Sequence, residues 1–108
     1  MRKMRVATTG LGLKHKEKLT ELSFKLPKGA EILSAQLEHK DDDYTLWLTY
    51  ITPSEAYEDG VKHLYPWTEN RIFVCDCTYT EIDIHEHKYI GNITVDNMPC
   101  AVFVLSYE

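Results

Sequence analysis

Two stretches of the sequence combine residue types that could bind a phosphorylated ligand. Residues 8–16 (TTGLGLKHK) contain two glycines whose backbone N–H groups could approach a phosphate, and Lys14 and Lys16 could neutralise its charge. The second stretch is the rigid aromatic triplet Tyr65-Pro66-Trp67 with His63 just before it, in a segment expected to be a loop. Its planar side chains could stack on a nucleobase or anchor a protein partner with little loss of conformational entropy.

Each stretch also has a purely structural interpretation, and both alternatives stay open. Residues 8–16 lack the four-residue gap and the Gly-Lys-Ser/Thr ending of a Walker loop, so they could be a flexible lead-in or a hairpin of the first strand. Tyr65 and Trp67 could fold back as a small satellite core over one end of a sheet. In the functional interpretation, the ligand contacts Lys14, Lys16, His63, Tyr65, Trp67 and Arg71.

The segment from Cys75 to His87 holds thiol, carboxylate and imidazole groups, but its spacing does not predict a metal site. Cys75 and Cys77 share one strand face, and His85 and His87 share another if the segment is extended. Side chains two residues apart on a flat strand diverge, whereas paired zinc cysteines are normally separated by at least two residues. We therefore expect no metal and no cofactor, with the two cysteines as small buried apolar residues.

No arrangement of residues indicates catalysis. The acidic triplet at 41–43 has neither the alternating ligands nor the glycine of a calcium loop, so it predicts a charged hairpin turn. The sequence contains no Gly-x-Ser-x-Gly elbow and no recognisable context for a Cys-His pair. We expect a binding protein and not an enzyme.

Length and charge predict the domain organisation that must position these residues. A chain of 108 residues is expected to form one domain, residues 1–108, and 44% hydrophobic residues supply its core. The net charge of -5 argues against general nucleic-acid binding. Residues 1–18 hold six basic residues and one acid, whereas residues 19–108 hold six basic and sixteen acidic residues. We expect a basic lead-in arm or first hairpin at 1–18, attached to an acidic β core at 19–108.

The sequence also predicts the compartment. No apolar run is long enough for a signal peptide or a membrane span, so no membrane partner is expected. Three cysteines in no framework spacing fit reduced thiols. We therefore expect a cytoplasmic protein.

Apolar and polar residues alternate with a period of two along most of the chain, which is typical of β-strands. In the second expected strand, Leu33, Ala35 and Leu37 face the core, and Trp47 and Phe73 are expected to be core residues of later strands. The expected strands are 19–26, 32–39, 44–51, 71–80, 88–95 and 101–107.

Turn and cap residues separate these strands. Pro27-Lys28-Gly29 predicts a tight turn that pairs the first two strands as a hairpin, and residues 96–99 (DNMP) predict the last turn. A short helix is expected over 53–59, with Thr52 as its cap, Pro53 at its first position and Gly60 as its stop.

Together these patterns predict an all-β fold with one short helix, in the form of a small antiparallel sandwich or barrel of about six strands. Small open sheets often cover an unpaired edge with a copy of themselves, so we also expect a homo-oligomer.

The turn and core motifs carry a resemblance to a known family. Over roughly residues 19–108, the chain resembles a family of small uncharacterised domains found mostly in bacteriophages and their hosts. That family is built around an lPkGAkIL hairpin, a central LW and a closing YiGT and VfHvfe pattern. The resemblance implies a β-rich accessory protein that binds a host component, in the host cytoplasm. The matching segments are residues 26–34 (LPKGAEILS), 46–47 (LW), 71–74 (RIFV), 89–91 (YIG) and 102–104 (VFV).

Two binding hypotheses follow. In the first, the protein counteracts a host process, antiviral defence, by sequestering a phosphorylated nucleotide-like signal between the basic segment and the aromatic residues. In the second, it is a protein–protein interaction module that blocks a host or phage protein through its acidic surface. The expected partners are thus a small nucleotide or a host protein.

Overall fold

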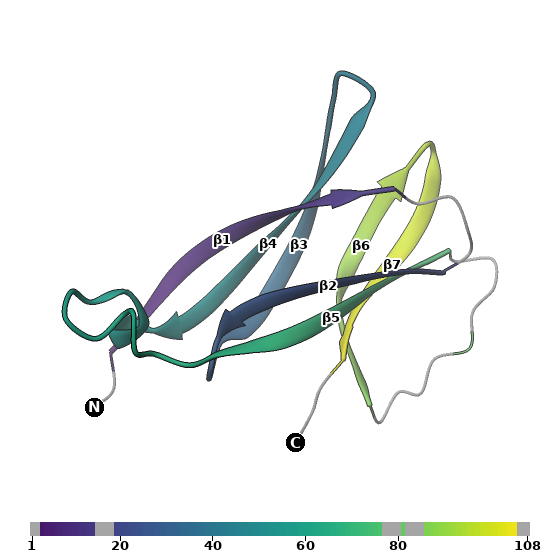
Figure 1. Ribbon diagram of the computed structural model, residues 1–108. Helices are drawn as coiled ribbons and strands as arrows, with labels where there is room; N and C mark the ends of the chain where they lie inside the picture. Colours follow the sequence, from purple (N-terminus) through teal and green to yellow (C-terminus); the bar gives the residue numbers. More distant parts are fainter. Residues whose placement is uncertain (1–2, 15–18, 77–80, 82–85, 106–108) are drawn as a thin grey trace.

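The chain folds into two antiparallel β-sheets that pack face to face (Figure 1). The computed structural model describes residues 3–14, 19–76, 81 and 86–105. Sheet A has the strand order β1-β4-β3, with bounds Met4–Leu13 (β1), Asp43–Pro53 (β4) and Glu31–Lys40 (β3). Sheet B has the order β2-β5-β7-β6, with bounds Leu19–Pro27 (β2), Trp67–Asp76 (β5), Met98–Leu105 (β7) and His87–Val95 (β6).

This architecture confirms the predicted all-β fold and, of the two predicted forms, it is the sandwich. The described residues form seven strands where about six were expected. No helix among the described residues is long and apolar enough to cross a membrane.

The extra strand is β1, which corrects the prediction of a lead-in arm or first hairpin for residues 4–13. β1 pairs along its whole length with β4, from Met4 opposite Pro53 to Leu13 opposite Tyr44. Its inward side chains are small or polar except near its end, so the period-two pattern is weak there. β1 is a strand because its backbone pairs with that of β4, and the alternation of its own residues does not reveal this partner.

The predicted hairpin between the first two strands is also wrong. β2 pairs with β5 in sheet B, and β3 pairs with β4 in sheet A, so the turn after β2 carries the chain from one sheet to the other. In that turn the Ala30 N–H donates to the Pro27 carbonyl at 3.1 Å, and Gly29 has a φ of 88°. A positive φ at this position is what a type II turn requires, so the turn itself was correctly placed and only its role differs.

A β-bulge explains why Leu33 does not face the core as expected. Ile32 lies opposite Tyr50 and Ser34 opposite Thr49, which leaves Leu33 as an extra residue on β3. The extra residue shifts the alternation by one, so Ile32 is buried and Leu33 is exposed. Beyond the bulge, Ala35 and Leu37 pack against the core as predicted.

Both hairpins close with two-residue turns of acidic or amide residues. Asp41 and Asp42 join β3 to β4 with φ values of 51° and 67°, which confirms the predicted charged turn. Asp96 and Asn97 join β6 to β7 with φ values of 50° and 64°, and Met98 already belongs to β7. Type I′ turns need a positive φ at both central residues, and Asp and Asn tolerate that conformation better than most side chains.

The predicted helix over 53–59 is a single 3₁₀ turn, η1 (Ser54–Tyr57). Pro53 precedes it and makes no side-chain cap bond. The predicted cap, Thr52, is instead the fully buried penultimate residue of β4, and its Oγ1 has no hydrogen-bond partner among the described residues. Strand pairing with β1 extends β4 to Pro53, so the two residues that were predicted to cap and open the helix end a strand instead.

η1 is fastened to sheet A by a pair of tyrosines. The hydroxyls of Tyr50, on β4, and Tyr57 lie 2.6 Å apart. Burial and this hydrogen bond raise the pKa of Tyr50 well above its usual 10.0. The Arg5 guanidinium lies over the Tyr57 ring, 4.9 Å from its centroid. Tyr57 of η1 thus contacts both β4, through Tyr50, and β1, through Arg5.

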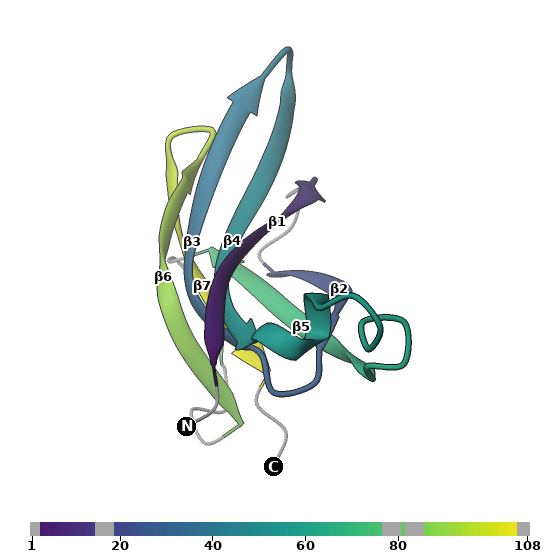
Figure 2. The same ribbon diagram turned by 90° about the vertical axis from the view of Figure 1, so that its left-hand side faces the viewer.

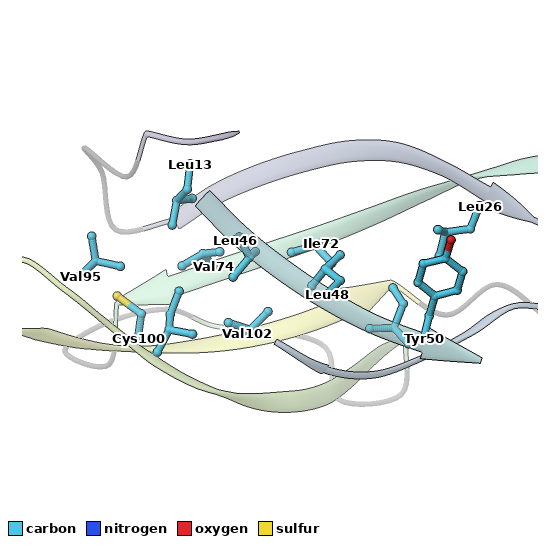
Figure 3. Packing of buried hydrophobic residues seen from close by; sticks show 12 residues of the cluster. Leu13, Leu26, Leu46, Leu48, Tyr50, Ile72, Val74, Val95, Cys100 and Val102 are labelled. Carbon is cyan, nitrogen blue, oxygen red and sulfur yellow. The ribbon is translucent and has the colours of Figure 1, made fainter. Parts of the chain in front are cut away.

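The core lies between the central strands of the two sheets (Figure 3). Leu46 and Leu48 of β4 are fully buried against residues of β5 and β7. Leu26 and Tyr50 close one end of this row in Figure 3, and Leu13, Val95 and Cys100 close the other. The opposing residues of sheet B are Ile72, Val74 and Val102.

The sandwich is closed along one side, where β3 and β6 lie next to each other (Figure 2). The Lys88 Nζ of β6 lies 3.0 Å from the Glu31 Oε1 of β3, and the Tyr44 hydroxyl donates to the Asp96 carboxylate. On the other side, between β1 and β2, the inward side chains of Leu11 and Leu22 are only partly buried.

Trp47 and Phe73 were expected in the core, but both lie on the outer faces of the sheets. Trp47 is 40% exposed on the outer face of sheet A, and Phe73 is half-buried on the outer face of sheet B, edge-on to His87. Trp47 lies opposite Gly10 of β1, and a Cβ added at Gly10 would lie 3.0 Å from the indole. The indole thus covers the backbone of Gly10, which has no side chain of its own. Aromatic residues opposite glycines in edge strands commonly supply this missing packing.

The Gly10–Trp47 contact predicts a position-specific cost within β1. Gly10→Val is expected to lower the free energy of unfolding by ~1–3 kcal/mol, because the new side chain collides with the indole. Gly12→Val, on the same face of the same strand, has nothing within 4 Å of its added Cβ and should cost less. Urea denaturation of both variants, repeated with Trp47→Ala, measures the difference. An equal cost at the two glycines, or no relief by Trp47→Ala, would contradict the contact.

The buried Tyr50 predicts a loss of stability in alkali. Above about pH 10 the tyrosine ionises in the unfolded chain but stays protonated in the folded one, so the unfolded state is favoured as pH rises. Tyr50→Phe should therefore show a shallower fall of Tm above pH 10 than the parent protein. Calorimetry across this range, with Tyr89→Phe on an exposed tyrosine as control, tests the expectation. Parallel curves for parent and Tyr50→Phe would refute it.

Candidate functional site

The predicted ligand-binding residues do not form one site. Lys14 directly follows β1 at the end where Leu13 lies opposite Tyr44, whereas Trp67 begins β5 opposite Pro27 at the other end of the sandwich. A ten-residue strand such as β1 spans about 30 Å. Lys16 lies outside the described residues. The basic and aromatic segments are therefore too far apart to enclose one small ligand.

The aromatic loop mainly holds the crossing turn in place. The Tyr65 hydroxyl donates to the Lys28 carbonyl at 2.7 Å, and the Lys28 N–H donates to the Pro66 carbonyl at 2.9 Å. Trp67 is 45% exposed and meets the Tyr57 ring edge-on, with centroids 6.2 Å apart. Tyr65 folds back onto the end of the sandwich as the satellite-core alternative predicts, whereas Trp67 stays exposed.

His63 and Arg71 are likewise placed apart from Lys14. His63 is exposed in the turn that precedes the aromatic triplet. Arg71 lies on the outer face of sheet B, 3.4 Å from the Glu21 carboxylate and 3.9 Å from that of Glu69. Two carboxylates beside one exposed guanidinium compensate its charge, so Arg71 offers little attraction to a phosphate.

The end of the sandwich that carries Lys14 contains a cavity of about 840 Å³. It lies between the end of β1, the start of β2 and the two hairpin tips, which point the same way in Figure 1. Four acidic residues line it, and Lys14 is the single basic residue among its described lining residues. We name this cavity the acidic cleft, and its acidic residues are Asp42, Asp43, Asp96 and Glu21, of which Glu21 also pairs with Arg71 on the outer face.

A second cavity of about 740 Å³ adjoins the acidic cleft, and Tyr44 and Asp96 line both. The hydrogen bond from the Tyr44 hydroxyl to the Asp96 carboxylate forms the boundary and raises the pKa of Tyr44, so this phenol stays protonated as a donor. The His39 ring stacks on Tyr44 with centroids 4.3 Å apart. The remaining polar lining of the second cavity is uncharged amide and hydroxyl, from Gln36, Asn92, Thr94 and Asn97.

Sequence reasoning missed the acidic cleft because its residues come from four separate segments. The acidic triplet predicts a turn and Asp96 predicts part of another turn, but neither pattern says that residues of the two turns line one cavity. The available signal was the turn chemistry itself, since two hairpins of the same sandwich that turn at acidic residues can place those residues at one end.

The segment considered for a metal is only partly described. Cys77 and His85 lie outside the described residues, while Cys75 is buried and His87 stacks edge-on against Phe73. Within the described ranges, no three His, Cys, Asp or Glu side chains gather closely enough to hold a metal ion.

The resemblance of residues 19–108 to a phage-associated family stays a prediction. Comparison of the chain with known protein families, with curated proteins and with solved structures found no match.

Proposed function

We propose that the protein is a non-enzymatic binding domain whose acidic cleft receives a positively charged segment of a partner protein. The observation that carries this proposal is the charge of the cleft, whose lining holds three aspartates of the hairpin tips, Asp42, Asp43 and Asp96, and a single described basic residue, Lys14. Such a set of oxygen acceptors attracts lysine and arginine side chains, and a carboxylate can accept two hydrogen bonds from one guanidinium.

The position of the carboxylates supports recognition of a defined segment. Asp42 sits in a two-residue turn with positive φ, Asp43 is the first residue of β4, and Asp96 begins the other turn. The hydrogen bond between Tyr44 and Asp96 joins the two sheets at this point. Acceptors held by turns and by a bond between sheets lose little entropy when a partner binds.

The wider charge distribution favours the same class of partner. Residues 19–108 carry sixteen acidic residues against six basic ones, so the body of the protein attracts cations over a longer range. The Tyr44 side chain also lines the cleft, and its ring is already stacked on the His39 ring. Long-range attraction and local contacts thus act in the same direction.

The nucleotide-sequestration hypothesis has less support from this geometry. A phosphate at Lys14 would lie beside the cleft carboxylates, which repel it, and the stacking aromatics are at the opposite end of the sandwich. The acidic-surface hypothesis is therefore the one we carry forward. A role against a host process, antiviral defence, rests on the family resemblance and stays a prediction.

Removing charge from the cleft tests the proposal. Asp42→Asn/Asp43→Asn keeps turn-compatible side chains but removes two carboxylates, so it is expected to weaken binding of an octa-arginine peptide by at least about tenfold. Isothermal titration calorimetry at two salt concentrations measures the effect, and binding by the parent should weaken as salt rises.

A matched variant separates the cleft from net charge. Glu58→Gln/Asp59→Asn removes the same two charges from the exposed loop after η1, at the other end of the molecule, and should bind as the parent does. Equal weakening in both variants would show that only net charge matters and would overturn the cleft. A thermal shift with nucleotides, combined with no peptide binding, would favour the sequestration hypothesis instead.

A further inference from the structure

β1 is an edge strand with one side unpaired by any described residue. Sheet A has the order β1-β4-β3, so β1 bonds to β4 on one side only. The ten residues of β1 therefore present a row of backbone N–H and C=O groups that can bond to another strand.

The other three edge strands carry features that hinder pairing, and residues 6–13 of β1 do not. β3 and β6 each contain a register irregularity, and they lie beside each other along the closed side (Figure 2). β2 carries two charged side chains and a proline, namely Glu21, Lys25 and Pro27. β1 keeps one unbroken register with β4, and residues 6–13 contain neither a charge nor a proline.

The side chains of β1 also leave apolar surface uncovered. On the outer face, Val6 is 67% exposed and Met4 is 44% exposed. On the inner face, Ala7 and Leu11 pack against the core but are only partly buried. A strand placed beside β1 would cover both rows at once.

The sequence of β1 is complementary to itself when two copies run antiparallel. With a two-fold axis at Thr9, Ala7 of one copy lies opposite Leu11 of the other on the inner face. On the outer face, Val6 lies opposite Gly12, and Thr8 lies opposite Gly10, so each larger side chain meets a glycine. This register sets no two charged residues opposite each other.

The centre of β1 carries no charge that would oppose a second copy of this chain. Residues 6–13 are uncharged, and the basic residues Lys3, Arg5 and Lys14 lie toward the two ends of the strand, away from the axis at Thr9. We propose that two copies of this chain associate through β1, so that sheet A continues across the axis as a six-stranded sheet. This inference is independent of the cleft and of its partner.

Sedimentation velocity of the full chain over a wide concentration range tests the association. The expected result is a monomer–dimer equilibrium, with hydrogen exchange of the β1 amides slowed in the dimer and unchanged in β2. A monomer at every concentration overturns the proposal, and so does a dimer whose newly protected amides lie outside β1.

A pair of matched variants locates the contact. Thr8 and Ser23 are exposed hydroxyl residues on the outer faces of the edge strands β1 and β2. Thr8→Lys places like charges near the axis and should raise the dimer dissociation constant at least about tenfold, whereas Ser23→Lys should not. The reverse pattern overturns the proposal. If Thr8→Lys fails to fold, the exchange data on the parent protein decide alone.

Discussion

The contact between the inner faces of the two sheets is the interaction on which the rest of the structure depends. Leu46 and Leu48 of the central strand β4 are fully buried in the core cluster that also holds residues of β5 and β7. Because the central strands carry it, the edge strands need not be buried on both sides. The sheets close along β3 and β6, where two polar links join them, and they stay apart near the start of β2. The acidic cleft lies where this closure is incomplete.

The acidity of the cleft follows from the needs of the backbone. Each hairpin closes with two residues of positive φ, and the chain meets this need with Asp and Asn where glycine would also serve. Since β3–β4 and β6–β7 turn at the same end of the sandwich, the residues that close the hairpins also gather negative charge (Figure 1). A feature of local geometry has thereby become a feature of the molecular surface, and the bond between Tyr44 and Asp96 holds it in one arrangement.

The sequence predicts local structure well and pairing poorly. Alternation located six strands, and turn residues located both hairpin tips, because these signals act over a few neighbouring positions. The pairing of β1 with β4 and of β2 with β5 depends on residues far along the chain, so neither was predicted. The bulge at Leu33 reverses the faces of Glu31 and Ile32, the residues of β3 that precede it. The alternation of residue types does not reveal this bulge. The expected site failed for a related reason, since no local pattern says that Lys14 and Trp67 end at opposite ends of the sandwich.

The unbroken pairing of β1 with β4 has a consequence for how the sheet assembles. Strand β4 forms a hairpin with its neighbour β3, whereas every partner of β1 lies far along the chain, and closing a long loop costs more conformational entropy than closing a short one. We therefore expect the hairpin to form first and β1 to join it afterwards. During translation the order is the opposite, because β1 is synthesised first. It cannot pair with β4 until Pro53, the last residue of β4, has been synthesised.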